Sequence, residues 1–124
     1  MDFKELIVYQ KAFNVAMEIF EISKSFPKEE KYSLTDQIRR SSRSTCANIA
    51  EAFRKRIYPK HFISKLTDSD GENSETVVWL DFATSCKYLE KETHIRLISE
   101  CIEIGKLLNY MINNPEKFGS TEVF

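Results

Sequence analysis

The sequence predicts an all-α fold, an antiparallel up-and-down four-helix bundle. The 124 residues include only three glycines and three prolines, which leaves few turns and suits a few long helices. Apolar residues recur at helical spacing in four successive segments, and no internal repeat or low-complexity tract interrupts them. We therefore expect one bundle domain over residues 1–118 and a flexible C-terminal tail over residues 119–124.

The first predicted helix runs from about Phe3 to about Lys24 and ends before Phe26 and Pro27. It carries two apolar stripes, which are Leu6, Phe13, Met17 and Phe20, and Val8, Ala12, Val15, Ile19 and Ile22. Together the stripes are wider than one core-facing surface requires. The surplus apolar surface predicts an interface with another copy of the chain.

The second predicted helix runs from about Leu34 to about Arg54. Ser33 followed by Asp36 resembles a capping box at its start. Between Gln37 and Ala52 one helical face is small and polar, which lets a neighbouring helix approach closely.

The third predicted helix starts at Pro59 and continues to about Glu90. Gly71 lies in its middle, and a break at Asp70–Gly71 is the alternative. Continuity is favoured because apolar and small residues keep one helical phase on both sides of the glycine. Trp79 and Phe82 begin a second apolar stripe and add to the expected subunit interface.

The fourth predicted helix runs from about His94 to Asn113, with Thr93 as its N-cap and Asn114–Pro115 after its end. The residues expected to face inward are Ile98, Cys101, Ile102, Gly105, Leu108 and Met111 or Ile112.

The charges are distributed unevenly along the chain, although the net charge is only −1. Eight basic residues and one acid lie between Arg39 and Lys65, whereas acids dominate from Leu66 to Glu92. These charges either solvate helix faces and pair across the bundle, or form a dedicated anion-binding surface. The candidate nucleic-acid contacts are Arg39, Arg43, Arg54, Lys55, Arg56 and Lys60.

Three polar residues, Asn48, Glu51 and Glu75, occupy positions expected to face other helices. Burying a carboxylate is costly unless it is paired, and Arg40 is a plausible cation partner. We expect all three to be at least partly buried and bonded across helices. Such a polar network either fixes the helix register or lines a ligand pocket.

Catalytic and metal-binding patterns are not found in the sequence. Glu72 and Glu75 have no accompanying histidine, and the serines from Ser41 to Ser44 lack a nearby histidine base. We therefore expect no enzyme activity, no metal and no cofactor. Three cysteines without metal spacing favour a reducing, cytoplasmic location, and the absence of a long apolar run predicts no membrane partner.

Four segments resemble a family of bacterial four-helix-bundle proteins first named for open reading frames in intervening sequences of large-subunit ribosomal RNA genes. They are FKELIVYQKA (Phe3–Ala12), FPKEEKYSLTDQIRRS (Phe26–Ser41), NIAEA (Asn48–Ala52) and FISKLTDSDGENSET (Phe62–Thr76). The similarity extends from about Phe3 to about Phe118. Ala52 and Glu72 depart from the glycine and serine that many relatives have there.

The resemblance implies a ring-like homopentamer without catalytic residues. Related proteins include the accessory variability determinant of diversity-generating retroelements, which binds nucleic acid and a reverse transcriptase through a basic surface. Two functions stay open for this chain. One is a non-enzymatic oligomer that binds RNA or DNA, and the other is a homo-oligomeric scaffold for another protein.

Overall fold

A computed structural model of the chain describes residues 2–121. It contains four long helices, α1 (Ile7–Ser23), α2 (Leu34–Arg54), α3 (Pro59–Ser85) and α4 (Lys91–Asn113), and three short 3-10 turns, η1 (Phe3–Glu5), η2 (Lys28–Glu30) and η3 (Pro115–Phe118). No strand occurs in the described part of the chain. The predicted all-α four-helix bundle is confirmed.

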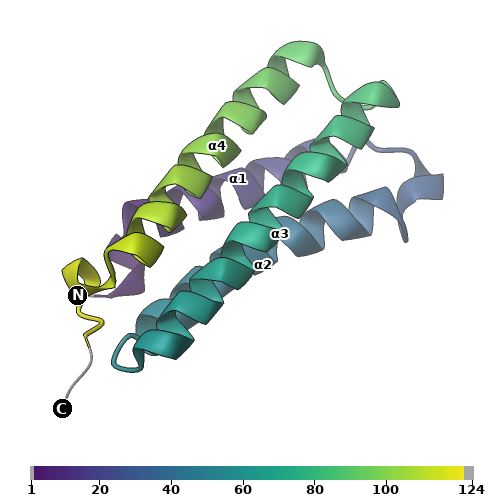
Figure 1. The fold of residues 1–124 in the computed structure, drawn as a ribbon. Helices are drawn as coiled ribbons and strands as arrows, with labels where there is room; N and C mark the ends of the chain where they lie inside the picture. Colours follow the sequence, from purple (N-terminus) through teal and green to yellow (C-terminus); the bar gives the residue numbers. More distant parts are fainter. Residues whose placement is uncertain (1, 122–124) are drawn as a thin grey trace.

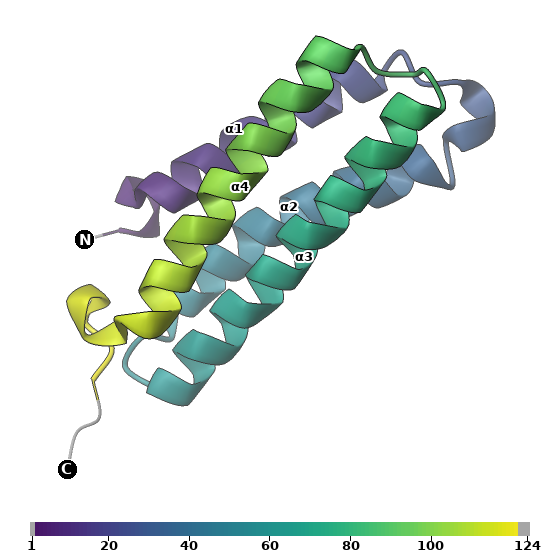
Figure 2. The same cartoon turned by 45° about the horizontal axis from the view of Figure 1, so that its top comes forward.

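Consecutive helices run in opposite directions along the bundle, and short connections join them (Figure 1). In both views α2 and α3 lie side by side along much of their length, and α1 lies beside α4 (Figure 2). The two ends of the described chain lie at the same end of the bundle as the α2–α3 connection. This arrangement gives α2 and α3 the most extensive contact of any helix pair.

All four helices contribute fully buried aliphatic or aromatic side chains to one core. The largest of these are Ile19, Ile38, Ile49, Phe62, Leu66, Leu80, Leu97, Ile104 and Leu108. Removing each such side chain from water contributes about 1.5–3 kcal/mol, before the entropy of ordering the chain is counted. The core therefore supplies the main driving force for assembling the four helices.

Helix α1 begins later than expected, at Ile7. Leu6 has an extended backbone (φ −68°, ψ 130°) and separates α1 from η1, which Asp2 and Glu5 close with a capping box. One of the two predicted stripes faces the core through Val8, Ala12, Val15 and Ile19. On the other stripe Phe13 and Met17 are 48 % and 47 % exposed, so α1 keeps a second apolar face at the surface.

The bounds of α2 agree with the prediction, but the cap at its start does not. The Ser33 hydroxyl donates to Glu30 Oε1 (2.6 Å), and the same carboxylate oxygen accepts the Leu34 backbone N–H (3.4 Å). The predicted capping box of Ser33 and Asp36 is therefore wrong. Glu30, which precedes the helix, caps it instead, because the turn at residues 31–33 places the Glu30 carboxylate beside the first residue of α2.

Helix α3 is continuous through Gly71, as predicted, and ends at Ser85, five residues early. Lys87 adopts a left-handed conformation (φ 65°), and the Tyr88 N–H donates to the Ala83 carbonyl (2.9 Å). This pattern closes a helix C-terminus in the way a glycine usually does. The sequence carries no glycine there, so the end of α3 has no signal that a sequence pattern could show.

Helix α4 begins at Lys91 with Glu90 at the N-cap, so the predicted Thr93 cap is wrong. Ile102, which we expected inside, is exposed. Leu97 and Ile104 fill the core instead, on the same helical face as Cys101, Leu108 and Met111.

Residues 122–124 of the predicted C-terminal tail lie outside the described residues, as does Met1. Within the described part of the tail, Gly119 has a left-handed backbone (φ 82°) and Ser120 is buried. None of the helices of residues 2–121 is long and apolar enough to cross a membrane.

Gly71 provides a test of the continuous α3 helix. An added Cβ would meet nothing within 4 Å, and the residue lies in the helix interior. Gly71→Ala should therefore stabilise the protein by about 1 kcal/mol, because alanine has the higher helix propensity. Thermal unfolding would show a midpoint a few degrees higher. Gly119→Ala is the opposing control and should destabilise, since its φ is positive; a destabilised Gly71→Ala variant would contradict a regular helix at this position.

Candidate nucleic-acid interface

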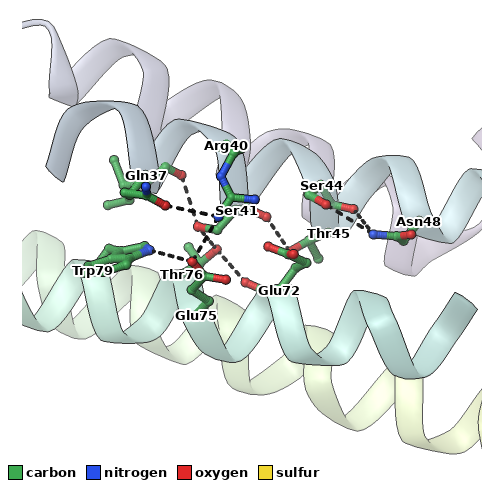
Figure 3. Close-up of polar contacts among 11 residues, drawn as sticks. Gln37, Arg40, Ser41, Ser44, Thr45, Asn48, Glu72, Glu75, Thr76 and Trp79 are labelled. Carbon is green, nitrogen blue, oxygen red and sulfur yellow. Dashed lines mark hydrogen bonds and ion pairs between the residues drawn. The ribbon is translucent and has the colours of Figure 1, made fainter. Parts of the chain in front are cut away.

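Short hydroxyl side chains lie between α2 and α3 at the middle of the bundle. The Ser69 hydroxyl donates to the Thr45 carbonyl oxygen (2.7 Å). Thr76 Oγ1 lies 2.8 Å from Ser41 Oγ and 2.9 Å from the Glu72 carbonyl oxygen (Figure 3). All four hydroxyl residues are buried. We call Ser41, Thr45, Ser69 and Thr76 the α2–α3 seam.

Two of the four predicted network residues, Arg40 and Glu75, meet at the surface edge of this seam. Arg40 Nη2 lies 3.2 Å from Glu75 Oε1 and 3.0 Å from Gln37 Oε1. Figure 3 shows the Arg40 guanidinium between these two residues. Glu75 Oε1 also accepts the Trp79 indole N–H (3.3 Å). One carboxylate therefore joins a cation of α2 to an aromatic side chain of α3.

The other two residues, Asn48 and Glu51, do not join this network. Asn48 Nδ2 donates within its own helix to the Ser44 carbonyl (2.9 Å) and hydroxyl (3.2 Å). Glu51 is exposed and pairs with Lys55 (3.3 Å) and Lys65 (3.5 Å). The expectation that Glu51 is at least partly buried is wrong, because Ile49 and Ala52 take the inward positions of this turn. The expected bond to a neighbouring helix is present, since Lys65 belongs to α3.

Glu72 is the unexpected carboxylate of this region. Its Oε2 atom is buried, and no hydrogen-bond partner lies among residues 2–121. Burial raises the pKa of Glu72 above its ordinary value of 4.5, and the nearby Glu75 charge raises it further, while Arg40 acts in the opposite direction. The sequence could not indicate this, since Glu72 occupies an ordinary polar position of α3.

The predicted alternative of a ligand pocket inside the network finds no support at the bundle centre. The gap lined by Val15, Thr45, Asn73, Thr76 and Ile104, among others, has about 0 Å³ available to a water molecule. The buried polar groups bond to one another, and Asn73 donates to the Cys101 carbonyl (2.9 Å). These contacts favour the interpretation that the polar groups fix the helix register.

A basic hollow of about 500 Å³ lies over the first half of α2. We call it the basic groove, and its lining is Lys31, Tyr32, Thr35, Asp36, Arg39, Arg40 and Arg43. Four cations thus face a single carboxylate on one surface. Of these residues the sequence predicts only Arg39 and Arg43 as contacts. The missed signal is that residues 36, 39, 40 and 43 lie on one face of α2 at spacings of three and four.

The two predicted arginines of the groove are held by α1. Arg39 Nε donates to the Ser23 hydroxyl oxygen (2.7 Å), and its guanidinium lies 4.9 Å from the centre of the Phe20 ring. The Arg43 guanidinium lies 5.6 Å from the same ring. Such cation–π contacts orient a charge without neutralising it. Within residues 2–121 neither arginine has a carboxylate within 4 Å, and Lys31 has none either.

The remaining predicted cations, Arg54, Lys55, Arg56 and Lys60, lie at the other end of α2 and the start of α3. Eleven residues of helix, about 16 Å, separate Arg43 from Arg54. Lys55 pairs with Glu51, and Arg56 donates to the Phe53 carbonyl (2.9 Å). Cations at a helix C-terminus are stabilised by the helix dipole. The six predicted contacts therefore form two groups, one along the first half of α2 and one around its C-terminal end. Stabilisation of the C-terminus of α2 explains why most cations of the second group lie where they do.

No group of three or more metal-ligating side chains occurs in the described part of the chain. Cys46, Cys86 and Cys101 are free thiols. His94 instead lies 2.7 Å from Asp81, joining α4 to α3.

The fold and these surfaces define a small antiparallel four-helix-bundle protein with a basic groove on its second helix. The chain belongs to the 23S rRNA-intervening sequence protein family, whose model matches residues 4–110. A crystal structure from Bacteroides thetaiotaomicron, described as a protein with unknown function from the S23 ribosomal protein family, is similar. It is 31 % identical, with a TM-score of 0.78 over 86 % of this chain and 96 % of that chain. No curated protein matches the sequence.

Glu72 gives this region a measurable pH dependence. Because its pKa is raised in the folded state, the folded protein holds the proton more tightly than the unfolded chain does. The contribution of Glu72 to stability is therefore greatest below pH 4.5 and is lost as the pH rises. Glu72→Gln should raise the thermal midpoint at about pH 7.5, and the gain should shrink towards about pH 4.

Glu51→Gln is the matched control, since the hydrogen bond from Lys55 lowers the pKa of Glu51. This substitution should not stabilise the protein at neutral pH. A Glu72→Gln variant with the same midpoint as the parent at every pH would show that the Glu72 carboxylate is not destabilised by burial.

Proposed function

We propose that this protein is a non-enzymatic homo-oligomer that binds the phosphate backbone of RNA or DNA through the basic groove. The observation that carries the proposal is the surplus of positive charge on one hollow surface, where four cations face one carboxylate. Phosphate contacts give affinity without sequence specificity, and this affinity falls steeply with salt.

The groove has the properties that a phosphate site needs. Lys31 and Arg43 are exposed and have no acidic partner in residues 2–121, so their charge is available. Arg39 is held in place by Ser23 and Phe20. An arginine fork presents parallel donors to phosphate oxygens, and holding it beforehand reduces the entropy cost of binding.

The apolar face left on α1 supports the oligomeric part of the proposal. Phe13 and Met17 open onto a shallow hollow between α1 and α2, whose lining is almost entirely apolar: Phe3, Tyr9, Phe13, Ala16, Met17, Cys46, Ala47, Ala50 and Arg43. A second copy that covers this face would bury it. The family resemblance implies a ring of five, in which each copy adds its own basic groove to a shared surface.

Arg43 links the two surfaces, because it lines both the apolar hollow and the basic groove. An oligomer that buries the apolar hollow therefore places a basic groove beside each subunit contact. Several grooves on one particle would bind a polynucleotide with greater avidity than one.

A homo-oligomeric scaffold for another protein is the second candidate. This candidate is favoured by the net charge of −1 and by the ion pairs that join Glu18 to Arg96 and Lys11 to Glu100. They indicate that the charged side chains stabilise the fold and do not bind a ligand. If the protein is such a scaffold, the apolar face of α1 is the functional surface, and the cations of the basic groove contact only solvent.

Binding across a salt series separates the two candidates. Fluorescently labelled RNA and DNA should bind at about 50 mM salt and dissociate progressively towards about 200 mM. The double variant Lys31→Glu/Arg43→Glu should weaken binding by about tenfold or more and reduce the salt slope by about 1 for each phosphate that the variant no longer neutralises. Neither side chain donates a hydrogen bond within the described fold, so the bundle should stay folded.

The double variant Arg54→Glu/Lys60→Glu makes the same change in charge at the other end of α2 and should bind nearly as well as the parent. Light scattering on each variant measures the oligomer mass, expected at five chains. Because Arg43 also lines the apolar hollow, a lower mass of Lys31→Glu/Arg43→Glu would assign its loss of binding to the subunit contact. Loss of binding only in the second variant would move the binding surface to that end. An oligomer that binds neither RNA nor DNA at low salt would support the scaffold.

A further inference from the structure

We propose that the basic groove accepts single-stranded nucleic acid in preference to a duplex, with bases stacked on Tyr32 and on the neighbouring Trp79–Phe82 pair. The inference rests on the proposed function, since it uses the same groove. It adds the class of ligand and assigns a role to three aromatic side chains that the phosphate contacts leave unused.

Tyr32 is the most exposed large aromatic side chain of the described residues, at 85 %. It lies in the turn between η2 and α2, and the Lys31 ammonium lies 5.2 Å from the centre of its ring. Tyr32 lines the basic groove together with Arg39, Arg40 and Arg43. A solvent-exposed ring beside several cations is the arrangement that proteins use to stack a base next to a bound phosphate.

Tyr32 also lines a second hollow, of about 440 Å³, on its other side. Trp79 and Phe82 of α3 form the aromatic part of that hollow, with ring centres 5.9 Å apart. Phe82 is 54 % exposed, so its ring is accessible from solvent. The two hollows therefore meet at Tyr32, with cations on one side and an aromatic pair on the other.

The Glu75 carboxylate holds one residue of each hollow in place. Glu75 Oε1 accepts the Trp79 indole N–H (3.3 Å) and pairs with Arg40 (3.2 Å), as Figure 3 shows. The distance between a groove cation and the aromatic pair is thus set by bonded contacts within the fold. A preorganised surface of this kind favours a ligand that presents phosphates and unpaired bases together.

Only a single strand satisfies both halves of this surface. A duplex keeps its bases stacked inside and presents phosphates alone, so Tyr32, Trp79 and Phe82 would stay unpartnered. A single strand leaves every base free to stack, and the stacking tolerates any sequence. Each stacked base is expected to strengthen binding about 5- to 150-fold.

The test compares a labelled single-stranded RNA of about 20 nucleotides with its duplex, at fixed salt, on the intact oligomer. Tyr32→Ala and Phe82→Ala should each weaken single-strand binding at least about fivefold and leave duplex binding unchanged. Tyr32→Phe should keep single-strand binding, since the ring remains. Tyr58→Ala is the matched control, because Tyr58 is also exposed but lies at the other end of α2.

The outcomes separate this inference from the proposed function. If the parent binds strand and duplex, and Tyr32→Ala weakens neither or both equally, stacking is wrong while groove binding stands. If the parent binds no nucleic acid, both proposals fail. If Phe82→Ala changes the oligomer mass in light scattering, Phe82 belongs to a subunit contact, and its role in stacking is overturned.

Discussion

The close approach of α2 and α3 across the α2–α3 seam is the constraint on which the rest of the structure depends. Serine and threonine are short enough to let the two helices approach, and buried hydroxyls must find partners. Ser69 bonds the Thr45 carbonyl and Thr76 contacts Ser41, and both of these contacts exist only in one register of the two helices. A shift of one turn would break both contacts between the helices, so the seam favours one register of α2 against α3.

That register places the surface groups. Arg40 reaches Glu75 only while α2 and α3 keep their alignment, and Glu75 in turn holds Trp79. The α1 helix completes the groove by giving Arg39 a hydroxyl acceptor at Ser23 and both arginines the ring of Phe20. The proposed binding surface is thus built from three helices, although most of its residues come from one.

The sequence predicted the parts of the fold that local patterns determine. The bounds of α2 and the passage of α3 through Gly71 follow from helical periodicity, which extends over many residues. Helix ends depend on single side chains and one or two dihedral angles, so the predictions for Ser33, Thr93 and the end of α3 were wrong. The polar seam was visible as small residues, but Glu51, which we expected to be partly buried, is exposed, and the buried carboxylate oxygen is that of Glu72, for which we made no such prediction. The groove was predicted only in part. Helical periodicity relates the residues of α2 to one another, but it does not extend to Lys31 and Tyr32, which lie in the turn before that helix.

A double-mutant cycle at the seam tests this account most directly. Ser41→Ala, Thr76→Val and the double variant would be unfolded in urea, and the free energies of unfolding compared. We expect each single substitution to cost about 1–3 kcal/mol, and the double variant to cost less than their sum by about 0.5 kcal/mol or more, because either single change already removes the contact between the two hydroxyls. Single costs below about 0.5 kcal/mol, or strictly additive costs, would contradict the claim that the seam fixes the register of α2 and α3.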